Sequence, residues 1–178
     1  MRGHVIGGIQ DAAKIPELRK KIQFTLFMIV IYRFGVFVPT PGIDAEAFAN
    51  RFKQASSSLF GMVNMFSGGA LENFSVFALG IMPYISVSII MQLLAATWKP
   101  LEEIQKEGMA GRRKITKWTR QGTIVLALFQ GTMISIGLES QNLVANPGLE
   151  FRFMTALTLT AGTAFIMWIG EQITERGM

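Results

Sequence analysis

Residues Phe66 to Leu94 read FSGGALENFSVFALGIMPYISVSIIMQLL and contain most of a long uncharged run. That run, Asn73 to Trp98, holds twenty-six residues without a charge. At about 1.5 Å per helical residue, it is long enough to cross a bilayer core of roughly 30 Å. We therefore predict a membrane-spanning helix from about Phe74 to Trp98. Pro83 lies inside this run and is expected to kink the helix, because proline removes one backbone hydrogen bond.

The residues just before this run are also uncharged, but they are polar. Gln54 to Leu71 carries four serines, three glycines and an asparagine, which are costly to place in hydrocarbon. We predict a short helix from Leu59 to Phe66 that folds back inside the protein, joined to the spanning helix by a hinge at Gly68–Gly69. Non-helical backbone at membrane depth is tolerated where protein buries it or where it lines a watery cavity. The segment is therefore a candidate for a position inside a pore.

The composition favours a membrane protein with four spans. Half of the residues are hydrophobic, only 16% are charged, and the apolar residues form long runs. We predict a single all-α membrane domain over residues 1–178, with spans at about 22–38, 74–98, 121–138 and 153–170. Between the second and third spans, Leu101 to Arg120 is predicted to be a basic loop, which Gly108 and Gly111 keep from forming one continuous helix.

The placement of positive charge predicts the orientation of the chain. Of the 17 Lys and Arg residues, thirteen lie in Met1–Lys21, Lys99–Arg120 and Glu171–Met178, which are alternate connections between the predicted spans. This is the positive-inside pattern, so both termini and the middle loop are expected in the cytoplasm. A net charge of +5 also fits nucleic-acid binding, but the placement of the charges makes this the weaker interpretation.

Arg33 is the one charge inside a predicted span, and it has two interpretations. An ionisable residue at membrane depth indicates function by default. However, Arg33 lies about 16 Å along the helix from Ile22, within reach of the outer interface for a long side chain. We favour a structural role as an anchor or packing partner.

The sequence carries no enzymatic signature. His4 is the one histidine and there is no cysteine, which excludes a histidine-based triad, a histidine cluster and thiolate metal sites. No dinucleotide-binding or Walker A pattern occurs, and the carboxylates lie almost wholly in the predicted connections. We expect neither catalysis nor a metal or cofactor.

Four stretches in the same order resemble the SecY family of protein-conducting channels. They are the stretch quoted above, IPELRKKIQFTLFMIVIYRFGVFVPTPGI (Ile15 to Ile43), KEGMAGRRKITKWTRQGT (Lys106 to Thr123) and MWIGEQITERG (Met167 to Gly177). The resemblance covers nearly the whole chain. The family has about ten spanning helices, whereas four are predicted in this chain. The resemblance therefore implies the amino-terminal portion of a channel.

The resemblance also implies roles for particular residues. Ile81 and Ile85 match positions in a ring of aliphatic side chains at the waist of the pore, where such side chains form a seal around a passing peptide. Ser86 and Gln130 match the lateral gate, through which apolar segments reach lipid. The implied plug comprises Leu59, Phe60, Gly61, Met62, Val63, Asn64, Met65, Phe66 and Ser67. The basic loop, with Arg112, Arg113, Lys114, Lys117 and Arg120, implies an orientation signal or a contact with a cytoplasmic partner.

The implied function is translocation of unfolded preproteins across the plasma membrane and insertion of membrane proteins into it. The implied partners are the SecE and SecG subunits, the motor ATPase SecA or the ribosome, signal sequences and lipid. Two alternatives remain open. A secondary transporter for a small solute requires ionisable residues around a central site, for which only Arg33 is a candidate. A self-contained four-helix assembly protein requires the faces that carry Ile81, Ile85 and Gln130 to be packed among its own helices.

Overall fold

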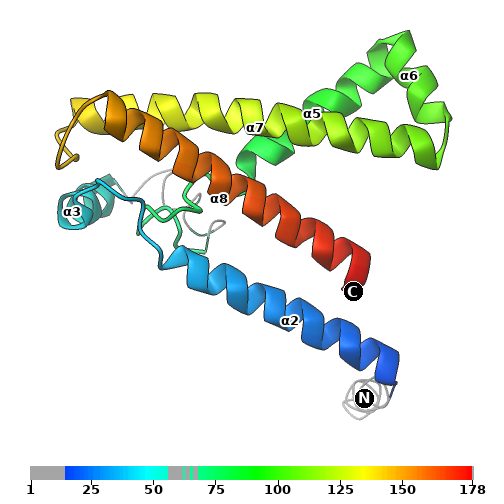
Figure 1. Cartoon of the computed structure of the whole chain (residues 1–178), viewed down its shortest axis with the longest axis horizontal. Helices are drawn as coiled ribbons and strands as arrows, with labels where there is room; N and C mark the ends of the chain where they lie inside the picture. Colours follow the sequence, from blue (N-terminus) through cyan, green and yellow to red (C-terminus); the bar gives the residue numbers. More distant parts are fainter. Residues whose placement is uncertain (1–14, 56–61, 63–64, 66–67, 178) are drawn as a thin grey trace.

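A computed structural model of the chain describes residues 15–55, 62, 65 and 68–177. The described residues are helical apart from turns and two isolated antiparallel bridges, Pro39–Ser75 and Ile43–Val144. The all-α prediction is therefore confirmed. The helices shown in Figure 1 are α2 (Pro16–Val36), α3 (Ala45–Ala55), α5 (Met82–Thr97), α6 (Lys99–Lys106), α7 (Met109–Ser140) and α8 (Leu149–Arg176).

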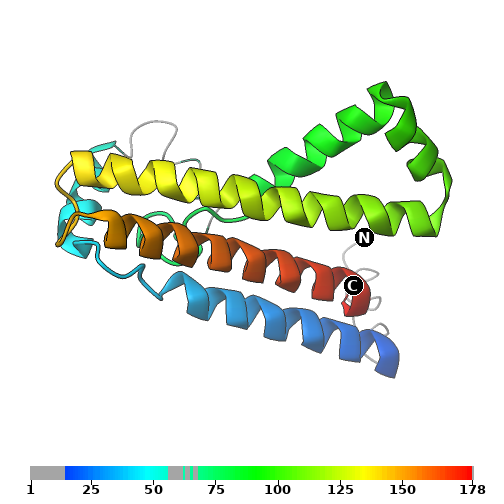
Figure 2. The same cartoon turned by 45° about the horizontal axis from the view of Figure 1, so that its top comes forward.

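Three long helices lie side by side, with α8 between α2 and α7 (Figure 2). Helix α5 packs against α7 and diverges from it, and the short helix α6 closes this divergence at the far end (Figure 1). The contact between α5 and α7 is close because Gly122 carries no side chain: a Cβ atom there would lie 2.9 Å from Cγ1 of Val87.

Two of the helices, α7 and α8, are long and apolar enough to cross a membrane. They contain the third and fourth predicted spans, 121–138 and 153–170, and extend beyond them at both ends. Helix α5 is apolar but has only 16 residues. Helix α2 covers residues 22–36 of the first predicted span and ends two residues before it does. It is charged at its start and at Arg33. Two of the four predicted spans thus correspond to helices that are long and apolar enough to cross a membrane, and the four-span architecture stays a prediction.

The prediction that the second helix begins at Phe74 and kinks at Pro83 is wrong. Residues 74–81 form turns and a bridge, and the helix begins at Met82. Pro83 is the second residue of α5, where its missing N–H needs no partner and its fixed φ suits a helix start. Positive φ angles at Phe74 (41°) and Gly80 (57°) keep the preceding backbone out of a helix.

The predicted basic loop is largely helical. Gly108, with φ of 75°, does separate α6 from α7, as predicted. Gly111 does not break the backbone: it lies buried in the first turn of α7, where a side chain would overlap the carbonyl of Ile104. Helix α6 begins at Lys99 after a single extended residue, Trp98, and Pro100 is its second residue.

The main hydrophobic core lies where the α7–α8 connection meets α3 and the turns before α5. Its buried members come from α7, from α8 and from the two connections: Phe74, Leu79, Ala127, Leu138, Leu143, Phe151 and Leu159. Helix α3 begins at the predicted outer connection because Asp44 caps it. The Oδ1 atom of Asp44 accepts hydrogen bonds from the N–H groups of Glu46 and Ala47, each at 3.1 Å.

Candidate functional site

The turns over residues 68–81 are built into the helix bundle. Their backbone pairs with the residues after α2: the N–H of Val76 donates to the carbonyl of Val38, and the N–H of Thr40 donates to the carbonyl of Phe74, each at 3.0 Å. These bonds satisfy backbone groups that no helix satisfies, which is the condition for irregular backbone at membrane depth.

The side chain of Phe77 also holds the turns over residues 68–81 in place. Its ring is 3% exposed and stacks on Tyr32 of α2, with ring centroids 5.4 Å apart, and on Phe165 of α8, at 6.0 Å. Two glycines allow this close approach, because a Cβ atom on Gly35 would overlap the Phe77 ring and one on Gly162 would overlap the backbone carbonyl of Val76. The segment that leads into α5 is therefore held between α2 and α8.

The predicted hinge lies at the start of these turns. Gly68 and Gly69 have φ angles of 62° and 89°, which favour glycine strongly. Nη1 of Arg33 donates a hydrogen bond to the carbonyl oxygen of Gly68 at 2.8 Å. Arg33 thus has the packing partner that the structural interpretation expected, and this partner is the predicted hinge.

Most of the predicted plug lies outside the described residues, namely Leu59, Phe60, Gly61, Val63, Asn64, Phe66 and Ser67. Of its members the structure describes Met62 and Met65, whose side chains are 62% and 81% exposed. The plug therefore stays a prediction.

The two predicted ring residues lie at the start of α5. Ile81 is the residue before the helix and Ile85 lies in its first turn, with the N–H of Ile85 donating to the carbonyl of Ile81 at 3.0 Å. Both side chains are exposed, at 41% and 43%. Further exposed apolar side chains follow along α5: Ile89, Ile90, Leu93 and Leu94. This face of α5 is open, whereas the face with Pro83, Val87 and Ala95 is buried.

The structure does not bring the two predicted gate residues together by a hydrogen bond. Ser86 is exposed on α5 and Gln130 is half-buried on α7. Within the part of the chain that the structure describes, neither side chain has a hydrogen-bond partner. Their assignment to a lateral gate stays a prediction.

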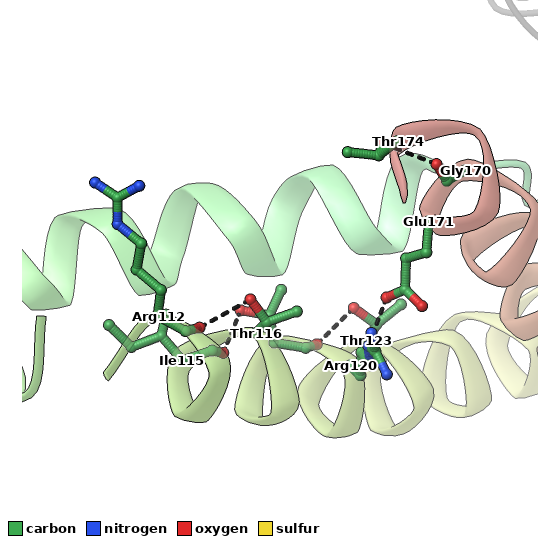
Figure 3. Close-up of polar contacts among 9 residues, drawn as sticks. Arg112, Ile115, Thr116, Arg120, Thr123, Gly170, Glu171 and Thr174 are labelled. Atoms are coloured by element: carbon green, nitrogen blue, oxygen red, sulfur yellow. Dashed lines mark hydrogen bonds and ion pairs between the residues drawn. The ribbon is translucent and has the colours of Figure 1, made fainter. Parts of the chain in front are cut away.

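The predicted basic residues lie on the first part of α7, and two of them are paired. Nζ of Lys114 lies 3.1 Å from Oε2 of Glu107, and Nε of Arg120 lies 2.5 Å from Oε1 of Glu171 on α8 (Figure 3). Arg112, Arg113 and Lys117 are exposed and have no ion-pair partner among the described residues.

A neighbouring pair lies on α6. The carboxylate of Glu102 accepts a hydrogen bond from Lys106, with Nζ 2.6 Å from Oε1, and this bond raises the pKa of the lysine. The first part of α7 and α6 together therefore form a charged end of the molecule that is partly neutralised by local acidic groups.

An ion pair between Glu139 of α7 and Arg152 of α8, called the clasp below, was not predicted from the sequence. It lies at the end of the two helices opposite to Arg120 and Glu171. Oε2 of Glu139 accepts a hydrogen bond from Nε of Arg152 at 2.7 Å and lies 2.6 Å from Nη2 of the same guanidinium. Oε1 accepts a hydrogen bond from the N–H of Gly148 at 2.9 Å. The available signal was the pair of opposite charges that flank the Asn146–Pro147–Gly148 turn between two apolar runs.

Comparison with known proteins gives, along most of the chain, the family that the sequence resemblance implied. Residues 75–178 match the family model described as SecY. The chain is similar to the protein translocase subunit SecY of Escherichia coli strain K12, with 51% identity across 92% of this chain and 38% of that protein. The SecY subunit of Halalkalibacterium halodurans is 47% identical, across 96% of this chain and 40% of that protein.

The subunit of Buchnera aphidicola subsp. Acyrthosiphon kondoi is 51% identical, across 92% of this chain and 47% of that protein. The chain thus spans less than half the length of these relatives. The all-helical fold, the two apolar helices and the match of residues 75–178 agree with one another. The chain belongs to the SecY family of membrane proteins.

Proposed function

We propose that this chain supplies the amino-terminal portion of a SecY channel, which passes unfolded preproteins across the plasma membrane and inserts membrane proteins into it. The observation that carries this proposal is the start of α5. There the exposed side chains of Ile81 and Ile85 follow directly after turns that α2 and α8 hold in place. Together with family membership, this supports a fixed apolar edge at the waist of a pore.

An apolar edge suits the passage of peptides. Aliphatic side chains offer no hydrogen bond that would hold a moving chain, and a narrow apolar constriction loses its water when it is empty. In the proposed channel, Ile81 and Ile85 form part of this ring, and helices beyond the fourth span supply the rest. Ser86 and Gln130 then border the lateral gate.

The plug is proposed to comprise residues 59–67, which turn at the hinge Gly68–Gly69. Two observations on described residues support this placement. The hinge glycines have the positive φ angles that permit a sharp turn, and Arg33 holds the carbonyl of Gly68. The hinge itself is therefore held at a defined point beside α2.

We further propose an architecture of four spans, with α2 and α5 crossing beside α7 and α8, and with both termini cytoplasmic. The charged end formed by α6 and the first part of α7 would then face the cytoplasm, as the positive-inside pattern expects. The proposed partners are SecE and SecG in the membrane, and SecA or the ribosome at the cytoplasmic face. The channel itself performs no catalysis.

The two alternatives are less well supported. A transporter needs ionisable groups around a central site, but Arg33 is bonded to a backbone carbonyl, and the SecY match covers more than half of the chain. A self-contained four-helix protein would bury the open face of α5, yet the side chains along that face are exposed.

Photo-cross-linking to a moving substrate tests the proposal. This chain would be fused to the remaining length of the Escherichia coli relative to give a joined channel, with a photoreactive residue at Ile81, Ile85 or, as a control, Val87. A preprotein stalled in the joined channel should cross-link from Ile81 and Ile85. Val87 should not react, because its side chain is buried against Gly122 of α7. Equal cross-linking from all three positions, or none from Ile81 and Ile85, would contradict the proposal.

A further inference from the structure

An open groove of about 310 Å³ runs between α7 and α8, in the half of each helix next to their connection. Its walls are mostly apolar side chains from both helices. They include Leu128, Thr132, Ile136, Arg152, Phe153 and Leu157.

The groove exists because the two helices touch closely at one point and carry larger side chains on either side of it. At the contact, a Cβ atom on Gly131 would lie 3.0 Å from Cα of Ala156, and Ala156 is buried at the floor of the groove. The side chains of Leu128 and Phe153, in contrast, are about half exposed or more. The floor is therefore set by small residues and the walls by large ones.

The lining of the groove is hydrocarbon except for one hydroxyl and one guanidinium, and the guanidinium is ion-paired with Glu139. The hydroxyl of Thr132 donates to the carbonyl of Leu128 at 2.8 Å, so it is satisfied within its own helix. Arg152 is the one charged residue in the lining. Its Nε and Nη2 bind Glu139, but a guanidinium has five N–H donors, and the Arg152 side chain is 40% exposed. Donors therefore remain for an anionic ligand.

We propose that this groove docks one phospholipid, with an acyl chain between α7 and α8 and the phosphate on Arg152. The proposal rests on the membrane topology of the proposed function, which places Arg152 at the outer interface and the rest of the groove at hydrocarbon depth. An arginine fork matches phosphate oxygens in charge and geometry, which favours a phospholipid over an uncharged lipid. The apolar walls accept the acyl chain without leaving a polar group of the groove lining unpaired.

The test uses this chain in liposomes with phosphatidylethanolamine that carries a photoreactive acyl chain. A diacylglycerol with the same acyl chain but no phosphate is the comparison probe. Labelled peptides are then mapped by mass spectrometry. We expect the phospholipid to label residues 128–136 and 149–157 about tenfold more than the diacylglycerol does. This is the factor expected for a charge-assisted hydrogen bond.

Two pairs of variants separate the acyl site from the phosphate site. Thr132→Phe fills the groove and should lower its labelling about tenfold, whereas Met133→Phe, at an exposed neighbour outside the lining, should leave it unchanged. Arg152→Gln should remove the preference for the phospholipid, and Arg152→Lys, which keeps a cation, should retain most of it.

Equal labelling by both probes, or no effect of Thr132→Phe, would overturn the proposal while leaving the channel function intact. If no part of α7 is labelled by either probe, the chain is not inserted as proposed. In that case the proposed topology fails together with the lipid site.

Discussion

The contact between Gly162 and the backbone of Val76 gives a sharp test of how the turns before α5 are held. In Gly162→Ala, the new Cβ would overlap the carbonyl oxygen of Val76, lie 2.7 Å from its carbon and lie 3.3 Å from Cδ1 of Phe77. The opposing atoms are mainly backbone, so no side-chain rotation relieves the overlap. Either α8 or the turns over residues 68–81 must move.

The size of the effect follows from two opposing contributions. Overpacking against a fixed neighbour costs up to about 3 kcal/mol, and alanine gains about 1 kcal/mol over glycine inside a helix. A net loss of about 2 kcal/mol lowers Tm by roughly 4–8 °C for a chain of this size. The matched control is Gly170→Ala in the same helix, where a Cβ atom would meet nothing within 4 Å. The control should raise Tm by roughly 2–4 °C.

Thermal unfolding of the purified chain in detergent, followed by circular dichroism, measures both variants. We expect the Tm of Gly162→Ala to fall and the Tm of Gly170→Ala to rise. If Gly162→Ala is as stable as Gly170→Ala, then α8 does not hold the turns as described, and the fixed edge at the start of α5 loses its support.

Three further predictions follow from the polar contacts. Arg33→Gln removes the cation that binds the hinge carbonyl, so we expect greater ion leak through the joined channel in planar bilayers, with Arg33→Lys closer to wild type; unchanged leak in Arg33→Gln would contradict this role. Glu139→Gln weakens the hydrogen bonds to Arg152, and we expect a lower Tm at low salt, whereas an equal or higher Tm would show that the clasp does not stabilise the α7–α8 connection. The ion pair of Arg120 and Glu171 is partly exposed, so a double-mutant cycle with Arg120→Gln and Glu171→Gln should give a coupling energy of less than about 1 kcal/mol that falls with added salt. A larger coupling energy that salt does not change would contradict the description of this pair as solvent-exposed.

The sequence predicted those parts of the fold that depend on composition alone. The apolar runs within α7 and α8 are continuous and end near charges, so hydropathy located both helices. The start of α5 could not be predicted from composition. Residues 73–98 are uniformly uncharged whether the backbone is helical or not, and a proline suits either a kink or a first turn. The choice depends on Val38, Tyr32 and Phe165, which are distant in sequence.

The candidate site, too, was predicted only in part from the sequence. The spacing of Ile81 and Ile85 predicted a shared helical face, and their assignment to a pore came from the resemblance to the family. The partner of Arg33 was not predictable, because its acceptor is a backbone carbonyl 35 residues further along the chain, and every residue carries such a group. The groove at Arg152 was missed for a similar reason, since it requires the crossing of two helices.

The decisive measurement is the ion conductance and preprotein export of the joined channel, because both depend on whether Ile81 and Ile85 line the pore. Ile81 and Ile85 would both be replaced by serine, and a second variant would carry serine at Ile124, an exposed residue of α7. We expect the first variant to leak ions or to accept weaker signal sequences while export continues, and we expect the second variant to behave as the unaltered channel. Unchanged sealing and unchanged signal-sequence selectivity in the first variant would mean that the start of α5 does not line the pore.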